Sequence, residues 1–151
     1  MALYLVQHGL SLPKEIDSER GLSEEGRSEV ERIAGVAKGY GVTVSFIVHS
    51  GKKRALQTAE IMAAYLKPHL GIRPTSGLDP NDDVEPWVKK LESAADTMLV
   101  GHLPFLEKLV SRLIIGKPEP VVFKLQNGGI LCLAMHSGAW VIRWALMPHI
   151  G

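Results

Sequence analysis

The sequence is poor in cysteine and almost balanced in charge, and it has no long apolar run. Cys132 is the single cysteine of 151 residues, so no intramolecular disulfide can form, and its apolar neighbours suit a buried thiol in a reducing compartment. Seventeen basic against sixteen acidic side chains leave a net charge of +1, which argues against general nucleic-acid or membrane binding. Without a membrane-spanning run or a basic-then-apolar leader before the first strand, we expect a cytoplasmic protein.

What the sequence does contain is an alternation of short apolar runs and amphipathic segments. Its length suits one domain, residues 1–151, with no internal repeat or linker. Strands are predicted near residues 2–6, 45–48, 72–75, 97–100, 121–126, 130–135 and 140–145, and helices near 23–39, 54–66, 84–94 and 104–115. This order predicts a three-layer α/β/α fold, a mostly parallel mixed sheet flanked by helices, with the last three strands forming an antiparallel meander.

Three of the predicted strands end in reactive or cationic side chains. His8 follows the first strand, Arg54 lies shortly after the second, and His102 follows the strand at 97–100. The carboxyl ends of parallel strands meet at one edge of a sheet, where open α/β folds place their ligands. We therefore expect these three side chains to converge, which a structural role for each histidine would leave unexplained.

The residues at these strand ends resemble a known family. Gln7-His8-Gly9 resembles the Arg-His-Gly signature of the histidine phosphatase (phosphoglycerate-mutase-like) superfamily, with glutamine in place of the arginine. Segments 17–26, 49–59 and 100–104 resemble further family motifs in the family's order. The short length and the tail at 144–148 most resemble the SixA-type phosphohistidine phosphatases. Each motif alone is weak, but four in order over this length are specific.

The resemblance implies a covalent mechanism without a cofactor. His8 would attack phosphorus through one ring nitrogen, while a backbone carbonyl holds the other nitrogen and fixes the tautomer. Arg54 would donate its planar fork to two phosphate oxygens. His102, protonated when phosphate is bound, would stabilise the developing negative charge. Gly9 would allow close backbone approach, and Ser50 is a further expected phosphate-binding residue.

Gln7 is the departure from the family pattern. Its amide can donate hydrogen bonds to phosphate, but it brings neither a charge nor a guanidinium fork. Lys52, Lys53 or Arg20 could supply the missing charge, although the lysines also suit a solvated loop and Arg20 could pair with a nearby carboxylate. Substitution of Gln7 by arginine should raise activity unless one of these cations already fills the place.

The leaving-group acid is not fixed by the sequence. Acidic residues gather where larger family members often supply this acid, and the sequence does not choose among Asp79, Asp82, Asp83 and Glu85. Asp82 and Asp83 are also plausible helix caps. A phosphohistidine substrate departs as imidazole and needs less acid assistance than an alkyl phosphate, which favours that substrate.

Three functional hypotheses follow from these residues. The first is a phosphatase whose partner is a phosphorylated protein, such as a phosphorelay histidine domain, or a small phosphomonoester. The second is a phosphate- or phosphoprotein-binding module that lost turnover with the signature arginine. The third is a metal hydrolase with zinc on His8, His49 and His102. The sequence disfavours zinc, because it has no histidine pair at helix-face spacing, so we predict no metal.

Overall fold

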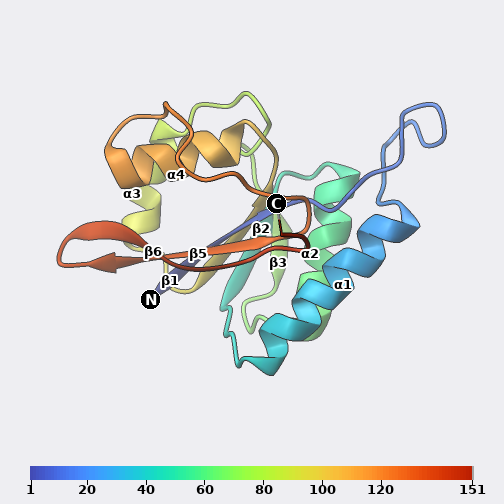
Figure 1. Ribbon diagram of the computed structural model, residues 1–151, viewed down its shortest axis with the longest axis horizontal. Helices are drawn as coiled ribbons and strands as arrows, with labels where there is room; N and C mark the ends of the chain where they lie inside the picture. The colour runs from blue at the N-terminus through green and yellow to red at the C-terminus, as the bar shows by residue number, and fades with distance from the viewer. Residues whose placement is uncertain (151) are drawn as a thin grey trace.

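The apolar runs form a six-stranded sheet within residues 1–150, the part of the chain that the computed structural model describes (Figure 1). Its strand order is β3-β2-β4-β1-β5-β6. The bounds are β1 (Ala2–Gln7), β2 (Phe46–His49), β3 (Ile72–Pro74), β4 (Thr97–Gly101), β5 (Ile130–His136) and β6 (Ala139–Leu146). β1 to β4 run parallel, and β5 and β6 add an antiparallel hairpin. Residue 151, where the predicted domain ends, lies outside the described residues.

Helices cover both faces of this sheet. They are α1 (Glu24–Gly39), α2 (Lys53–Leu66), α3 (Glu85–Glu92) and α4 (Phe105–Ile115). In Figure 1, α1 and α2 lie together on one side of the strands, and α3 and α4 lie on the other. α1 begins where predicted, because the Ser23 hydroxyl accepts a hydrogen bond from the Gly26 amide at 3.0 Å. The predicted three-layer α/β/α fold is therefore confirmed.

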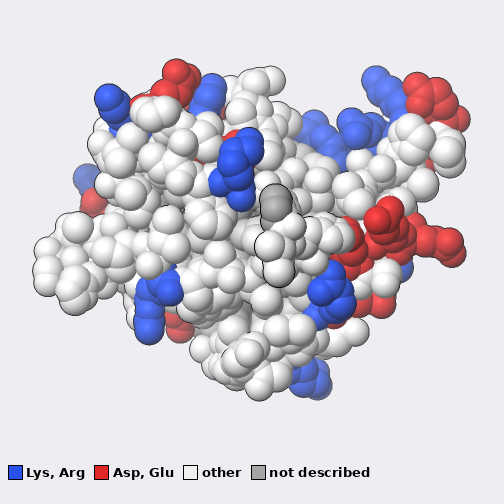
Figure 2. Space-filling view, viewed as in Figure 1, with Lys and Arg blue, Asp and Glu red and all other residues white. Residues whose placement is uncertain are grey.

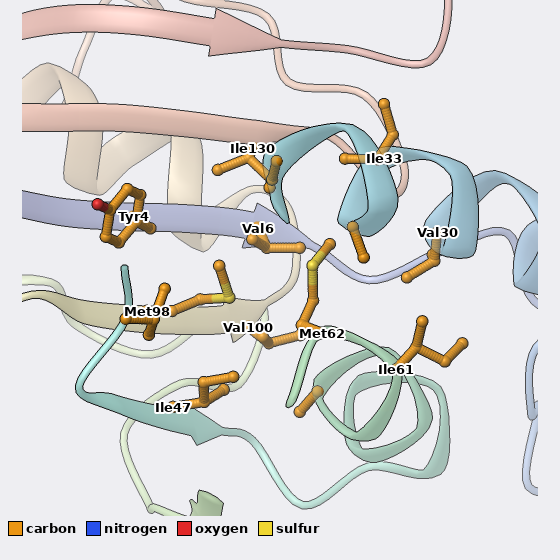
Figure 3. Packing of buried hydrophobic residues seen from close by; sticks show 14 of the residues in the cluster. Tyr4, Val6, Val30, Ile33, Ile47, Ile61, Met62, Met98, Val100 and Ile130 are labelled. Carbon is orange, nitrogen blue, oxygen red and sulfur yellow. The ribbon is translucent and has the colours of Figure 1, made fainter. Parts of the chain in front are cut away.

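Strand alternation divides the core into two layers. Tyr4 and Val6 of β1 pack toward α1 and α2, whereas Leu3 and Leu5 pack toward α3 and α4. Figure 3 shows the first layer, in which side chains of β1, β2 and β4 meet those of α1 and α2. A slip of one residue would exchange the two apolar sets, so this pattern fixes the register and hence which residue ends each strand.

One predicted strand is wrong. Residues 121–126 form no strand, although their apolar character suggested one. β5 already pairs with β1 on one side and with β6 on the other, which leaves this segment no free edge beside β5. Its Leu125 amide donates instead to the Glu107 carboxylate on α4 at 3.0 Å. The tail is therefore a hairpin of two strands, turned at Ser137 and Gly138, rather than a meander of three.

Among residues 1–150, no helix is both long enough and apolar enough to cross a bilayer.

Candidate active site

The candidate site lies where β1, β2 and β4 end side by side. Gln7 pairs with Gly101, and His49 with Val100, so the three strands stop at nearly the same level. The His8 amide extends the β1–β4 ladder by donating to the Gly101 carbonyl at 3.0 Å. The residues that follow the strands are thus brought together, as the sequence predicted.

His8 carries a free ring nitrogen. Its Nδ1 lies 2.7 Å from the Gly9 carbonyl oxygen, which can only accept a hydrogen bond. Nδ1 therefore carries the proton, and Nε2 keeps its lone pair. Burial, together with the positive charges of Arg54 and Arg20, lowers the pKa of His8 to about 4, although the hydrogen bond to Gly9 opposes this shift. The imidazole is neutral at pH 7, in the tautomer that a nucleophile requires.

His102 faces His8 from the neighbouring strand. The two ring centroids are 5.0 Å apart, and His102 is buried. Its Nε2 lies 2.6 Å from the Ser50 hydroxyl, whereas its Nδ1 has no hydrogen-bond partner among residues 1–150. Burial lowers the pKa of His102 to about 3, helped by His8, Arg54 and Lys52. The side chain is therefore neutral without an anion, and Ser50 contacts this histidine.

Arg54 lies in the first turn of α2, close to both histidines. Within the described part of the chain, no carboxylate oxygen comes within 4.0 Å of its guanidinium. Burial lowers the pKa of Arg54, as does the charge of Arg20 nearby. The positive end of the α2 dipole adds to the positive potential around Arg54. No acidic residue in the first turn of α2 offsets it.

Gln7 ends β1 at the position where the resemblance led us to expect an arginine. Its side chain is 9% exposed, and its Oε1 is buried with no hydrogen-bond donor among the described residues. In β1 it belongs to the face that carries Leu3 and Leu5. The position thus supplies an uncharged amide at the edge of the pocket.

Three further cationic side chains lie around this site, and we call them the rim: Arg20, Lys52 and Lys53. Figure 2 shows Lys and Arg side chains gathered where the loop after β1 projects beside α2. Lys53 Nζ lies 2.9 Å from Asp17 Oδ2 and 3.7 Å from Glu19 Oε2. Lys52 Nζ lies 4.0 Å from Asp79 Oδ1. Arg20 has no carboxylate within that distance in residues 1–150.

The structure separates the four acidic residues that the sequence could not rank. Asp82 Oδ2 accepts a hydrogen bond from the Asp79 amide, and Asp83 Oδ1 accepts one from the Glu85 amide. The Glu85 carboxylate is held by Arg112 through contacts of 2.7 and 2.9 Å. Asp79 is the carboxylate of the four that faces the rim, beside Lys52, and its charge raises the pKa of Arg54.

Comparison with known proteins agrees with this geometry. The sequence profile of the Histidine phosphatase superfamily (branch 1) matches residues 3–79. An uncharacterised protein of Picosynechococcus sp. is 30% identical, over 92% of this chain and 87% of its own length. The chain belongs to the histidine phosphatase superfamily.

A second relative and a solved structure are both SixA proteins. The phosphohistidine phosphatase SixA of Escherichia coli K12 is 26% identical, over 98% of this chain and 94% of its own. A structure of the protein histidine phosphatase SixA complexed with tungstate superimposes with a TM-score of 0.84 at 26% identity, covering 98% and 97% of the two chains.

Two residues of this histidine phosphatase superfamily member hold the backbone around His8 without having been singled out in the sequence. Thr58 Oγ1 accepts from the Gly9 amide at 3.0 Å and donates to the Arg54 carbonyl at 2.7 Å, which links the two sides of the site. Asn127 Nδ2 donates to the His8 carbonyl at 2.9 Å. Thr58 looked like an ordinary helix residue, and Asn127 like a turn residue before two glycines.

Gly9 has a packing role as well as the expected one. A Cβ at Gly9 would lie 2.7 Å from Val30 Cγ2 and 3.1 Å from Leu22 Cδ2. The missing side chain therefore lets the chain after His8 pack against α1. Close approach of a ligand to the Gly9 backbone stays a prediction.

The placement of the histidine, cysteine and acidic side chains bears on the zinc hypothesis. Residues 1–150 contain no group of three or more His, Cys, Asp or Glu side chains placed to hold a metal ion. His49 is buried, and its Nδ1 accepts a hydrogen bond from the Gly51 amide at 3.1 Å. His49 thus stabilises the turn after β2, which accounts for the residue without a metal.

Proposed function

We propose that this chain is a phosphatase with His8 as its nucleophile and protein phosphohistidine as its substrate. The observation that carries the proposal is the pair of imidazoles 5.0 Å apart, one of which has its Nδ1 bound to a backbone carbonyl. Arg54 stands beside them without a carboxylate partner among the described residues. A neutral nucleophile next to uncompensated positive charge suits attack on a phosphoryl dianion.

The reaction would proceed in two displacements. His8 Nε2 donates its lone pair to phosphorus, and the bond from phosphorus to the substrate's imidazole breaks. That ring, protonated on its other nitrogen, keeps the electron pair and leaves as neutral imidazole. Water then attacks the phosphohistidine at His8, the P–Nε2 bond breaks, and inorganic phosphate leaves while the water proton passes to phosphate or solvent. The hydrogen bond from Nδ1 to Gly9 orients Nε2, which is the attacking atom in the first step and the leaving atom in the second.

Arg54 and His102 would stabilise charge during these steps. The fork of Arg54 can donate to two equatorial oxygens at once. His102 is neutral in the empty site because of burial and neighbouring positive charge. A bound dianion reverses the sign of that field, so it favours protonation of His102, which then donates to the transferring group.

The protein substrate is supported by the shape and composition of the surroundings. Beside Arg54 is a hollow of ≈ 610 Å³, lined by residues 51–54 together with Glu19, Leu56, Gln57 and Glu60. Neither His8 nor His102 lines it, so it adjoins the proposed site of phosphoryl transfer and offers a surface for a substrate protein, such as a phosphorelay histidine domain. A leaving imidazole also demands little of Asp79, whose side chain is 55% exposed. The similarity to SixA supports the same substrate class.

The test is hydrolysis of a phosphohistidine peptide, compared with a phosphoserine peptide of the same sequence. We expect phosphate release from the first at a far higher kcat/KM, unchanged by a chelator and absent in His8→Ala. Equal hydrolysis of both peptides would reject the substrate class while keeping the phosphatase. Loss of activity with the chelator would revive the metal hydrolase.

One observation favours a second candidate, a phosphoprotein-binding module. Gln7 places a neutral, buried amide where the family has a charged arginine. A neutral hydrogen bond contributes about 1 kcal/mol, against about 1.5–3 kcal/mol for one to a charged group, so glutamine at this position stabilises phosphate roughly two- to thirtyfold less than arginine would. Phosphopeptide binding without any phosphate release would identify this alternative.

A further inference from the structure

Gln7 is an uncharged residue at the position where the family signature has a positively charged arginine. Gln7 brings no positive charge, and its Oε1 can only accept hydrogen bonds, so that atom cannot contact a phosphate oxygen favourably. A phosphoryl group nevertheless arrives with close to two negative charges. If the site turns over phosphate esters or phosphoramidates, a second permanently charged group besides Arg54 should face the anion, in addition to His102, which becomes charged only when the anion binds.

The two lysines of the rim are poorly suited to that place. Lys53 is committed to Asp17 and Glu19, at 2.9 and 3.7 Å. Its contact with Asp17, with the amides of Gly21 and Glu19, holds the pKa of the Asp17 carboxyl down to about 2. Lys52 faces Asp79 at 4.0 Å and offers only a point charge.

Arg20 is held differently. Its Nη2 donates to the Ser11 hydroxyl at 3.2 Å, three residues after the nucleophile. The chain reaches Arg20 through a narrow loop that Ser11 and Leu22 close as an isolated bridge. Among the described residues, no carboxylate lies within 4.0 Å of its guanidinium. The fork is thus directed back toward the end of β1 with its positive charge uncompensated.

The loop that carries Arg20 is fastened to α2, the helix that carries Arg54. The Leu22 amide donates to Gln57 Oε1 at 2.7 Å. A Cβ at Gly21 would lie 2.8 Å from Lys53 Cε, so the loop packs against α2 as closely as a glycine permits. Arg20 itself has φ 53, a left-handed conformation that is unfavourable for a non-glycine residue.

We propose that Arg20 supplies the second guanidinium of the phosphate pocket, in place of the arginine that Gln7 replaces. This inference rests on the proposed function, because it assumes that a phosphoryl group binds above His8. Two guanidinium groups without carboxylate partners then face one dianion. In agreement with this placement, the charge of Arg20 lowers the pKa values of both His8 and Arg54.

The first experiment measures the dissociation constant of inorganic phosphate by titration calorimetry at low salt. Arg20→Asn removes the charge with a residue that tolerates the left-handed backbone. We expect phosphate to bind it about tenfold more weakly or worse, with Arg20→Lys in between. Arg27→Ala, an exposed arginine of α1 outside the site, is the matched control and should bind like the wild type. Arg20→Gly, which accepts the same φ, repeats the measurement if Arg20→Asn unfolds.

A double substitution identifies the place that Arg20 fills. If Arg20 already occupies the position of the missing arginine, Gln7→Arg should change phosphate affinity less than about twofold alone but restore about fivefold or more in Arg20→Asn. Wild-type affinity in both Arg20→Asn and Arg20→Gly, with a large loss in Arg54→Ala, would overturn the role of Arg20 and leave the proposed function standing. A wild type that binds no phosphate would overturn the proposed function itself.

Discussion

His8, which is half-buried, and His102, which is buried, form the floor of the site at the ends of two paired strands, whereas Arg20, Lys52 and Lys53 form an open rim on loops and at a helix start. Burial is the largest influence on both floor residues and lowers their pKa values to about 4 and 3. At the rim, ion pairs and their geometry decide which cation is free to bind a ligand. Desolvation therefore determines the protonation of the floor residues, and ion pairing determines which charges are available at the rim.

This difference has a physical consequence for experiments. Interactions in the buried floor are screened little by salt, whereas exposed charges at the rim are screened over about 8–10 Å at ordinary ionic strength. Floor substitutions should therefore change kcat at any salt concentration. Rim substitutions should act on substrate binding and fade as salt is added.

The largest effect is expected at the floor. His8→Ala removes the atom that attacks phosphorus, so turnover should fall by on the order of 10⁴ or more. Acid-quenched peptide mapping after rapid mixing of the wild type with substrate should find an acid-labile, alkali-stable phosphoryl group on the peptide that contains His8. Near-unchanged thermal unfolding of the variant is the control. Retention of full turnover in His8→Ala would end the covalent mechanism.

Arg54 stands between floor and rim, and its loss should have the second largest effect. Arg54→Ala removes two charge-assisted hydrogen bonds, which at about 1.5–3 kcal/mol each predicts at least roughly a hundredfold loss in kcat/KM. Arg54→Lys keeps the positive charge without the planar guanidinium and should therefore lose less kcat/KM than Arg54→Ala. If the two variants lose the same activity, the planar fork matters and the charge alone does not. A loss below tenfold in Arg54→Ala would place the phosphate elsewhere.

Much of the floor could be predicted from sequence because it depends on strands. The apolar runs determine where β1 and β4 end. Parallel pairing of these two strands then brings His8 and His102 together. The segment at 121–126 shows the limit of that logic. Its apolar residues resemble a strand, but strand formation requires a free sheet edge, and that is a property of the whole fold.

The supporting contacts could not be predicted in the same way. Asn127 reaches the His8 carbonyl across 119 residues of sequence, and no local pattern marks it. Thr58 is one turn from Arg54 within α2, so its contact with Gly9 depends on how that helix docks against β1. The pairing of Lys53 with Asp17 likewise depends on the fold of the intervening loop. Sequence named the cations, and only tertiary structure showed which are neutralised.

The third prediction uses Asp79 to separate leaving groups. A carboxyl that protonates an alkoxide leaving group contributes about 10²-fold or more, whereas a departing imidazole needs little help. Asp79→Asn should therefore slow hydrolysis of phosphoserine peptide by tenfold or more and leave phosphohistidine hydrolysis within about threefold. Asp83→Asn, at the start of α3, is the control. Equal losses on both substrates would show that Asp79 acts through Lys52 or Arg54 instead of as an acid.

The fourth prediction concerns pH. Because the pKa values of His8 and His102 lie below 6.5, the ordinary value, the unfolded chain binds protons that the folded chain does not between pH 6.5 and about 3 to 4. The contribution of these two residues to stability should thus be complete above pH 6.5 and be lost as the pH falls through that window. NMR titration of the ring protons should give midpoints near 4 and 3, and saturating phosphate should raise that of His102. Midpoints near 6.5 in the free protein would contradict a buried, neutral floor.

The smallest effect is expected at the rim, for Lys52. Its ammonium is 38% exposed and 4.0 Å from Asp79, a geometry in which ion pairs contribute about 0–1 kcal/mol. Lys52→Ala should lower kcat/KM by only two- to fivefold at low salt, through a weaker long-range attraction of the phosphorylated substrate. That difference should shrink toward unity at about 0.5 M salt, whereas the loss in Arg54→Ala should persist, because a partly buried contact is screened less. A loss for Lys52→Ala that is large and independent of salt would mean that Lys52 touches the phosphate directly, and the boundary between floor and rim would then have to be drawn outside it.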